Sequence, residues 1–88
     1  VDRALMGTFA LSLEDGPTTT DPSEAYTKEL VIRRAREVSL LADSSKMGTR
    51  SFVSAGHLGR INTIVTDAGV DERLFRSLKR RGIRVIAA

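Results

Sequence analysis

An acid, two hydroxyls and a lysine follow directly after a short apolar run at residues 38–42. They are Asp43, Ser44, Ser45 and Lys46. A lysine ammonium beside two hydroxyls suits an anionic group such as a phosphate, because each of them can donate a hydrogen bond to its oxygens. The competing interpretation is a plain turn after a strand, with Asp43 capping it, the serines shaping it and Lys46 exposed to solvent.

The neighbouring elements decide where this cluster lies. Short segments rich in branched apolar residues predict strands at 4–6, 38–42, 61–67 and 83–88. A helix is predicted from Asp21, which can cap it, to about Glu37, and a second helix over 71–81 is ended by Gly82. We expect a loop over residues 8–20, and a short strand at Phe52 and Val53.

Strand, helix, strand, strand, helix, strand is an order typical of an α/β fold with a mainly parallel sheet. Ligands of such sheets gather beyond the carboxyl ends of the strands. The cluster at 43–46 follows one strand, Thr66 and Asp67 follow another, and Gly7 and Thr8 follow the first. We therefore expect three polar strand ends to face one crevice, although for Asp67 a turn-capping role is the favoured interpretation.

Lys28 lies at helical spacing from Val31, Ile32 and Ala35, so it borders the apolar stripe of the first helix. Its ammonium group either reaches solvent or points into a pocket, and the pattern alone slightly favours solvent. Glu24 stands four residues earlier, where it can pair with Lys28.

Composition excludes several classes of protein. The 88 residues contain no cysteine, which rules out disulfides and thiolate zinc sites. His57 is the sole histidine, and there is no glycine-rich phosphate loop or nucleophile elbow, so we expect neither a metal site nor a cofactor. No apolar run approaches the roughly 18 residues of a membrane span. We expect a soluble, cytoplasmic protein with no membrane partner.

Positive charge gathers near the end of the chain. Two acids are followed by six bases after Val70, namely Arg73, Arg76, Lys79, Arg80, Arg81 and Arg84. Such a segment can attract nucleic acid, but a solvated helix face is the favoured interpretation.

Four segments carry a resemblance to a known family. The sequences "DRALMG", "LEDGPTTTDPSEAYTKELVIRRAREVSLLADSSKMG", "INTIVTDAGV" and "GIRVIAA" resemble the C-terminal effector domain of DeoR-type bacterial transcriptional regulators. The resemblance implies a three-layer α/β/α domain like that of ribose-5-phosphate isomerase and the CoA transferases, of which residues 1–88 form the C-terminal part. It further implies a repressor of sugar metabolism that senses a phosphorylated sugar and binds DNA only through a helix-turn-helix domain outside this chain.

The resemblance also assigns residues. Lys46 resembles the lysine that contacts the ligand phosphate in this fold, Asp2 and Gly7 resemble strand-end pocket residues, and Lys28 resembles a helix lysine shared by the family. With Asp43, Ser44 and Ser45 they form the predicted ligand site. One departure bears on the pocket near Gly7: the family is usually glycine-rich after the first strand, whereas Thr8 and Phe9 stand there in this chain.

Two further expectations concern activity and assembly. An aldose–ketose isomerase of this fold is the alternative function, but similar isomerases place a catalytic glutamate about where Lys28 stands, and an ammonium of ordinary pKa is no base at neutral pH. We therefore expect no enzymatic activity. Nearly apolar strands with only two helices to cover them also predict a homo-oligomer that buries the faces of Leu40, Ile64 or Val85.

Overall fold

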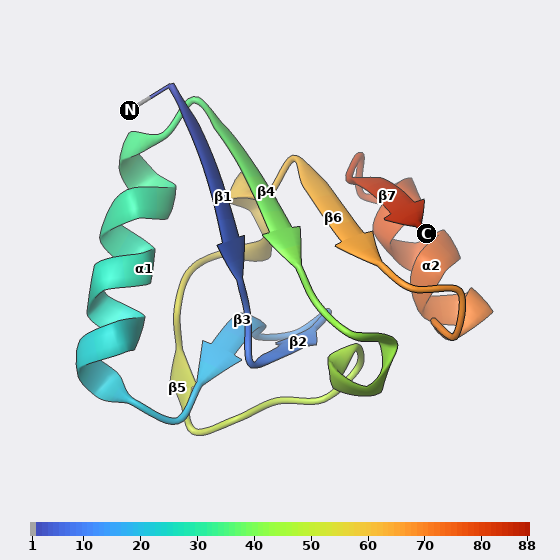
Figure 1. The fold of residues 1–88 in the computed structure, drawn as a ribbon, viewed down its shortest axis with the longest axis horizontal. Coiled ribbons are helices and arrows are strands. Elements are labelled where there is room, and N and C mark those ends of the chain that lie inside the picture. The colour runs from blue at the N-terminus through green and yellow to red at the C-terminus, as the bar shows by residue number, and fades with distance from the viewer. Residues whose placement is uncertain (1) are drawn as a thin grey trace.

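Four parallel strands form the main sheet of the protein, whose computed structural model describes residues 2–88 (Figure 1). The strands are β1 (Arg3–Gly7), β4 (Glu37–Leu41), β6 (Thr63–Thr66) and β7 (Arg84–Ala87), and they lie side by side in that order. Helix α1 (Pro22–Arg34) lies in the connection from β1 to β4, and helix α2 (Glu72–Arg80) in the connection from β6 to β7. The prediction of an α/β fold with a mainly parallel sheet is confirmed.

A second, smaller sheet is antiparallel, and its first two strands lie where a loop over residues 8–20 was predicted. It consists of β2 (Ala10–Ser12), β3 (Gly16–Thr19) and β5 (Val53–Ser54). Ser12 pairs with Gly16 across a three-residue connection. Gly16 has a φ of 68°, and a Cβ there would lie 3.0 Å from the carbonyl oxygen of Gly56, so the hairpin requires glycine. The short strand expected at Phe52 and Val53 is found one residue later.

Both helices begin where the sequence predicts. Asp21 accepts a hydrogen bond from the backbone N–H of Ser23 (3.0 Å), and Asp71 caps α2 in the same way. Helix α1 ends at Arg34, before the expected Glu37, because the N–H groups of Arg36 and Glu37 both donate to the Asp2 carbonyl and start β4. Neither helix is long and apolar enough to cross a membrane, and the described residues contain no other helix that is.

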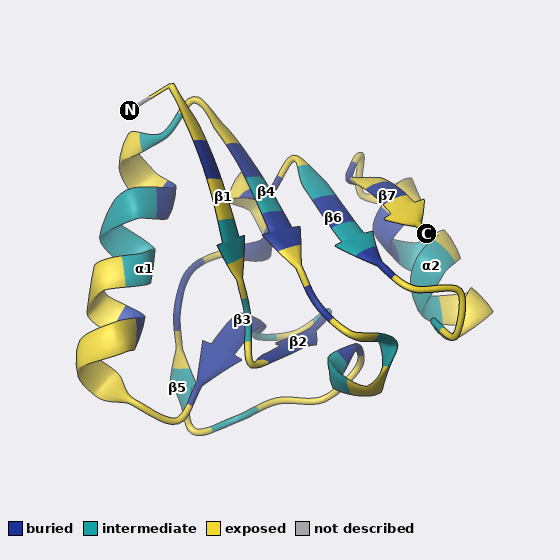
Figure 2. Ribbon diagram, in the orientation of Figure 1, coloured by how far each residue is buried: buried dark blue, intermediate teal, exposed yellow. Residues whose placement is uncertain are grey.

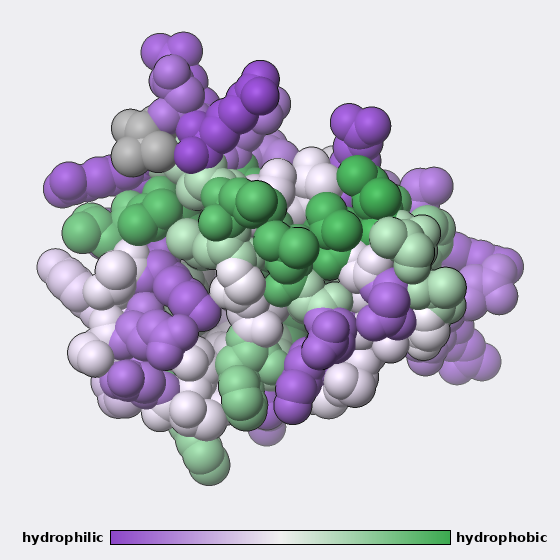
Figure 3. Space-filling view, viewed as in Figure 1, coloured by the Kyte–Doolittle hydropathy of each residue, from purple (hydrophilic) through white to green (hydrophobic). Residues whose placement is uncertain are grey.

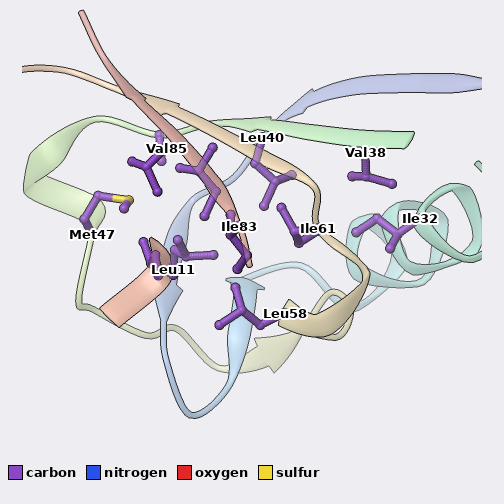
Figure 4. Packing of buried hydrophobic residues seen from close by; sticks show 12 residues of the cluster. Leu11, Ile32, Val38, Leu40, Met47, Leu58, Ile61, Ile83 and Val85 are labelled. Atoms are coloured by element: carbon purple, nitrogen blue, oxygen red, sulfur yellow. The ribbon is translucent and has the colours of Figure 1, made fainter. Parts of the chain in front are cut away.

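One face of the main sheet is covered by the rest of the chain. Each new strand is added on the same side of the previous one, so right-handed crossovers place all connections on one face. The side chains of Val38, Leu40 and Ile64 point to this covered face and are buried. Figure 4 shows the resulting core, in which Val38 faces Ile32 of α1. The buried cluster comprises Leu11, Ile32, Val38, Leu40, Ala42, Met47, Leu58, Ile61, Ile64, Leu78, Ile83 and Val85.

The opposite face of the sheet is open, and it is also apolar. Leu5, Leu41 and Ile86 point to it and are 70%, 43% and 41% exposed. Strand register places Leu41 beside Val65 and Val65 beside Ile86. Exposed and buried residues alternate along the strands in Figure 2, and Figure 3 shows a hydrophobic band across this face.

The third layer implied by the resemblance is not formed by residues 2–88, since helices and small sheet share the covered face. Leu40, Ile64 and Val85 were predicted to be covered by a second copy. That choice of residues is wrong, because all three are buried within the chain. The face left for a partner carries Leu5, Leu41 and Ile86 instead.

Candidate functional site

An open hollow of about 410 Å³ lies beyond the carboxyl ends of β1, β4 and β6. The three polar strand ends that the sequence predicted to face one crevice do meet there. Its lining residues are Thr8, Phe9, Leu41, Ala42, Asp43, Lys46, Val65, Thr66 and Asp67. We call this the strand-end hollow.

Lys46 supplies the only basic side chain among these lining residues. It closes a 3₁₀ turn, η1 (Ser44–Lys46), in which its N–H donates to the carbonyl of Asp43 at 2.9 Å. Its Nζ lies 4.8 Å from the centre of the Phe9 ring, within the range of a cation–π interaction. The turn after β4 thus brings Lys46 to Phe9, the second residue after β1, and both side chains line the hollow.

Asp67 ties two of the strand-end loops together. Its Oδ2 accepts from the N–H of Ser44 at 3.0 Å, and its Oδ1 accepts from the N–H of Gly69 at 2.9 Å. Hydrogen bonds from the Ser44 side chain, and then from these two N–H groups, lower the pKa of Asp67 below its ordinary 3.8. The bond from Gly69 confirms the turn-capping interpretation, and the bond from Ser44 adds a link to the turn after β4.

Gly69 leaves room for this link. A Cβ at its position would lie 2.8 Å from the Ser44 Oγ and 3.1 Å from the Asp67 Oδ1. A larger residue would therefore displace the serine hydroxyl. We call Ser44, Asp67 and Gly69 the loop clamp.

Thr66 ends β6 and is only 5% exposed. Its Oγ1 is the one buried side-chain oxygen or nitrogen for which the described residues provide no hydrogen-bond partner. Sequence reasoning placed Thr66 at a strand end but missed its unpaired hydroxyl, as it missed the contact of Phe9 with Lys46. The alternation that points Ile64 to the covered face also turns Thr66 inward, and this was the available signal.

Lys28 and Gly7 meet beside the hollow, without lining it. The Lys28 Nζ donates to the Gly7 carbonyl at 3.0 Å and lies 3.0 Å from the Glu24 Oε1. The predicted pair of Glu24 and Lys28 is confirmed. The lysine side chain is only 20% exposed, so it reaches to the end of β1 rather than into solvent.

Of the other predicted site residues, one lines the hollow and two do not. Asp43 lines the hollow, whereas Ser45 is exposed and does not. Asp2, which was predicted to be a pocket residue at a strand end, lies instead at the amino end of β1. There its carbonyl accepts from the Arg36 N–H, and its carboxylate is 3.7 Å from the Arg36 Nε. The strand-end pocket is at the opposite end of the strand, so we exclude Asp2 from the candidate site.

The chemistry of the hollow is that of binding. Lys46 can hold an anionic group, the carboxylate of Asp43 can accept from hydroxyls, and the Thr66 hydroxyl can donate or accept. Phe9, Leu41 and Val65 add an apolar wall. A small ligand that carries an anionic group, hydroxyls and an apolar surface would match all three kinds of lining.

The chain is similar in sequence to one known protein family and to several transcriptional regulators. The family described as "DeoR C terminal sensor domain" matches residues 1–68. The chain is 39% identical over 85 residues to the HTH-type transcriptional regulator GlpR of Haloferax volcanii. The match covers 97% of the chain and 33% of GlpR. It is 33% identical over 86 residues to the HTH-type transcriptional repressor GlcR of Bacillus subtilis, covering 98% of the chain and 33% of GlcR.

A third relative is the lactose phosphotransferase system repressor of Streptococcus mutans, which is 39% identical over 61 residues, or 69% of the chain and 24% of that protein. The chain spans about a third of the length of the first curated relatives that it matches.

Proposed function

Because the chain belongs to the DeoR C-terminal sensor domain family, we propose that it forms the effector-sensing part of a transcriptional repressor of sugar metabolism. The effector is a phosphorylated sugar, and it binds in the strand-end hollow. Two of the relatives described above are named as repressors, one of them for a lactose phosphotransferase system. That relative's name supports a sugar-linked role.

A single observation carries the proposal: Lys46 is the only cation among the residues that line the strand-end hollow, and its ammonium group stands on the Phe9 ring. A phosphate bound there gains a charge-assisted hydrogen bond. Gly7 and Lys28 support the position of the loop that carries Phe9, because the Lys28 ammonium holds the carbonyl at the end of β1. Neither needs to contact the ligand for this role.

Regulation then follows from differential affinity. An effector that binds one conformation of the sensor more tightly shifts the protein toward that conformation, and by linkage it changes the affinity for DNA. The relatives GlpR and GlcR are named as HTH-type regulators. We propose that DNA binding belongs to such a domain outside residues 1–88, that these residues are the C-terminal part of the sensor, and that the protein acts in the cytoplasm as a homo-oligomer.

The alternative function, an aldose–ketose isomerase, is less well supported. The relatives described above are transcriptional regulators or repressors. The position at which similar isomerases carry a glutamate holds Lys28, whose ammonium is engaged by Gly7 and Glu24. We propose binding without turnover. Incubation with ribose 5-phosphate should yield no ketose above buffer, and turnover lost on substitution of Lys28 would reverse this ranking.

The direct test of the proposed function is Lys46→Ala. Calorimetric titration with triose, pentose and hexose phosphates should show binding to the wild type, weakened in the variant by about 1.5–3 kcal/mol, the range for hydrogen bonds to charged groups. Lys79→Ala is a matched control, because Lys79 also stands over an aromatic ring (Phe75, 5.1 Å) but lies on α2, outside the hollow. Equal affinity in the wild type and Lys46→Ala would contradict the assignment.

A further inference from the structure

The Thr66 hydroxyl is buried at a cost to the fold. It is 95% buried, yet its Oγ1 has no partner within residues 2–88. A buried hydroxyl without a partner loses its hydrogen bonds to water and opposes folding. A valine has nearly the same shape and would fill the position without that loss. The hydroxyl therefore calls for a role other than packing.

Its position indicates that role. Thr66 lines the strand-end hollow, and the register that pairs Leu41 with Val65 places Ala42 and Thr66 at the next positions. Asp43 and Asp67 follow directly. Their carboxylates disfavour a phosphate near this end, whereas they favour neutral groups that donate hydrogen bonds. The cation of the hollow is Lys46, which attracts the anionic end of a ligand.

We infer that the Thr66 side chain rotates on binding, so that its Oγ1, which is enclosed in the unliganded protein, hydrogen-bonds a hydroxyl group of the effector. The hollow then orients a polyhydroxylated phosphate monoester with its phosphate at Lys46 and its hydroxyl-bearing end at Thr66 and Asp43. The inference rests on the proposed function, because it assigns one end of the same ligand. It makes Thr66 a specificity-determining residue, whose hydroxyl contributes to binding and lowers stability.

The test uses Thr66→Val in the full chain, with two measurements. Without ligand, thermal unfolding of the variant should occur about 2–8 °C above that of the wild type, since the unpaired hydroxyl is removed. In titrations, the affinity for the tightest sugar phosphate of the panel should fall about tenfold. The affinity for inorganic phosphate should be unchanged, whereas Lys46→Ala should weaken both.

Thr63→Val is the matched control. Thr63 is on the same strand, but it is half-buried, faces the open side of the sheet and lies outside the hollow. This variant should keep the wild-type affinity for both ligands. If Thr63→Val and Thr66→Val weakened binding equally, the effect would belong to the strand and the inference would be wrong.

The remaining outcomes separate this inference from the proposed function. Unchanged sugar phosphate affinity in Thr66→Val, or an equal loss for inorganic phosphate, would overturn the hydroxyl contact while leaving Lys46 as the anion site. A lower unfolding temperature in Thr66→Val would show that the fold itself uses the hydroxyl, and would also overturn it. A wild type that bound no sugar phosphate would remove both proposals together.

Discussion

Ile64 and Ile86 are the same residue type in neighbouring strands of one sheet, yet Ile64 is fully buried whereas 41% of Ile86 is exposed. The difference comes from which face each side chain points to. Ile64 points to the face that α1, α2 and the small sheet cover, and Ile86 to the face that nothing in residues 2–88 covers. Apolar strands of this kind are typical of a sheet covered on both faces, while the handedness of the crossovers decides which face is covered by the chain's own helices.

The first way to sharpen this comparison is to truncate both isoleucines. Ile64→Ala should reduce the free energy of unfolding by about 2–5 kcal/mol, because it leaves a cavity in a closed core. Ile86→Ala removes atoms that already contact water, and should cost less than about 1 kcal/mol in dilute solution. Urea denaturation measures both. Similar losses at the two positions would mean that the open face is covered in the monomer.

The second prediction concerns what covers the open face when residues 1–88 are alone. We expect self-association through Leu5, Leu41 and Ile86, since burying one such side chain contributes about 1.5–3 kcal/mol. Leu41→Glu should raise the dissociation constant at least tenfold, as measured by light scattering at micromolar concentration. Phe52→Ser is the control, because Phe52 is also highly exposed but lies outside the main sheet. A wild type that stayed monomeric would contradict the prediction.

A smaller loss of stability is expected at the loop clamp, which lies in the strand-end loops and not on either face of the sheet. In Gly69→Ala the new Cβ must displace the Ser44 hydroxyl, and holding a side chain away from its preferred rotamer costs about 0.5–1.5 kcal/mol. In Gly59→Ala no atom lies within 4 Å of the new Cβ, so stability should be unchanged or slightly higher. Equal unfolding free energies for the two variants would show that the clamp is too mobile to resist a methyl group.

The smallest effect belongs to the exposed carboxylate of the clamp. Since the fold lowers the pKa of Asp67, its ionised form stabilises the protein above the unfolded value of about 3.8, and this contribution is lost as the pH falls through the lower folded value. Asp67→Asn should be less stable than the wild type at pH 7, and the difference should shrink below about pH 4. Denaturation midpoints across this range would test it. A difference independent of pH would assign the effect to shape instead of charge.

Local sequence patterns were sufficient for the main sheet and both helices, whose caps at Asp21 and Asp71 are local signals. The small sheet could not be predicted in this way. Strand β2 has three residues, too few for an alternation to be read, and β3 pairs with β5, some 35 residues later in the chain. Pairing across such a distance depends on the packing of the whole chain.

The same distinction between local and long-range signals explains why only part of the candidate site could be predicted. Asp43 and Lys46 follow a strand that is clear in the sequence, so their place at its carboxyl end could be derived. Asp2 was assigned by resemblance to the correct strand but the wrong end of it. The alternation along β6 indicates that Thr66 points inward. The contact of Phe9 with Lys46, and the lack of a hydrogen-bond partner for the Thr66 hydroxyl, depend on side-chain positions in three dimensions and carry no local sequence signal.

The strands of the main sheet lie side by side in the order in which they occur along the chain. Within residues 2–88, β4, β6 and β7 can therefore each pair with a strand that was synthesised before it, and none has to be inserted between two that are already paired. From β1 to β7 this part of the sheet can grow strand by strand, with α1 synthesised before β4 and α2 before β7. The small sheet is completed in a different order, because its hairpin of β2 and β3 pairs with β5 (Val53–Ser54), which is synthesised after β4. Strand β5 therefore completes the small sheet only after β1 and β4 of the main sheet have been synthesised.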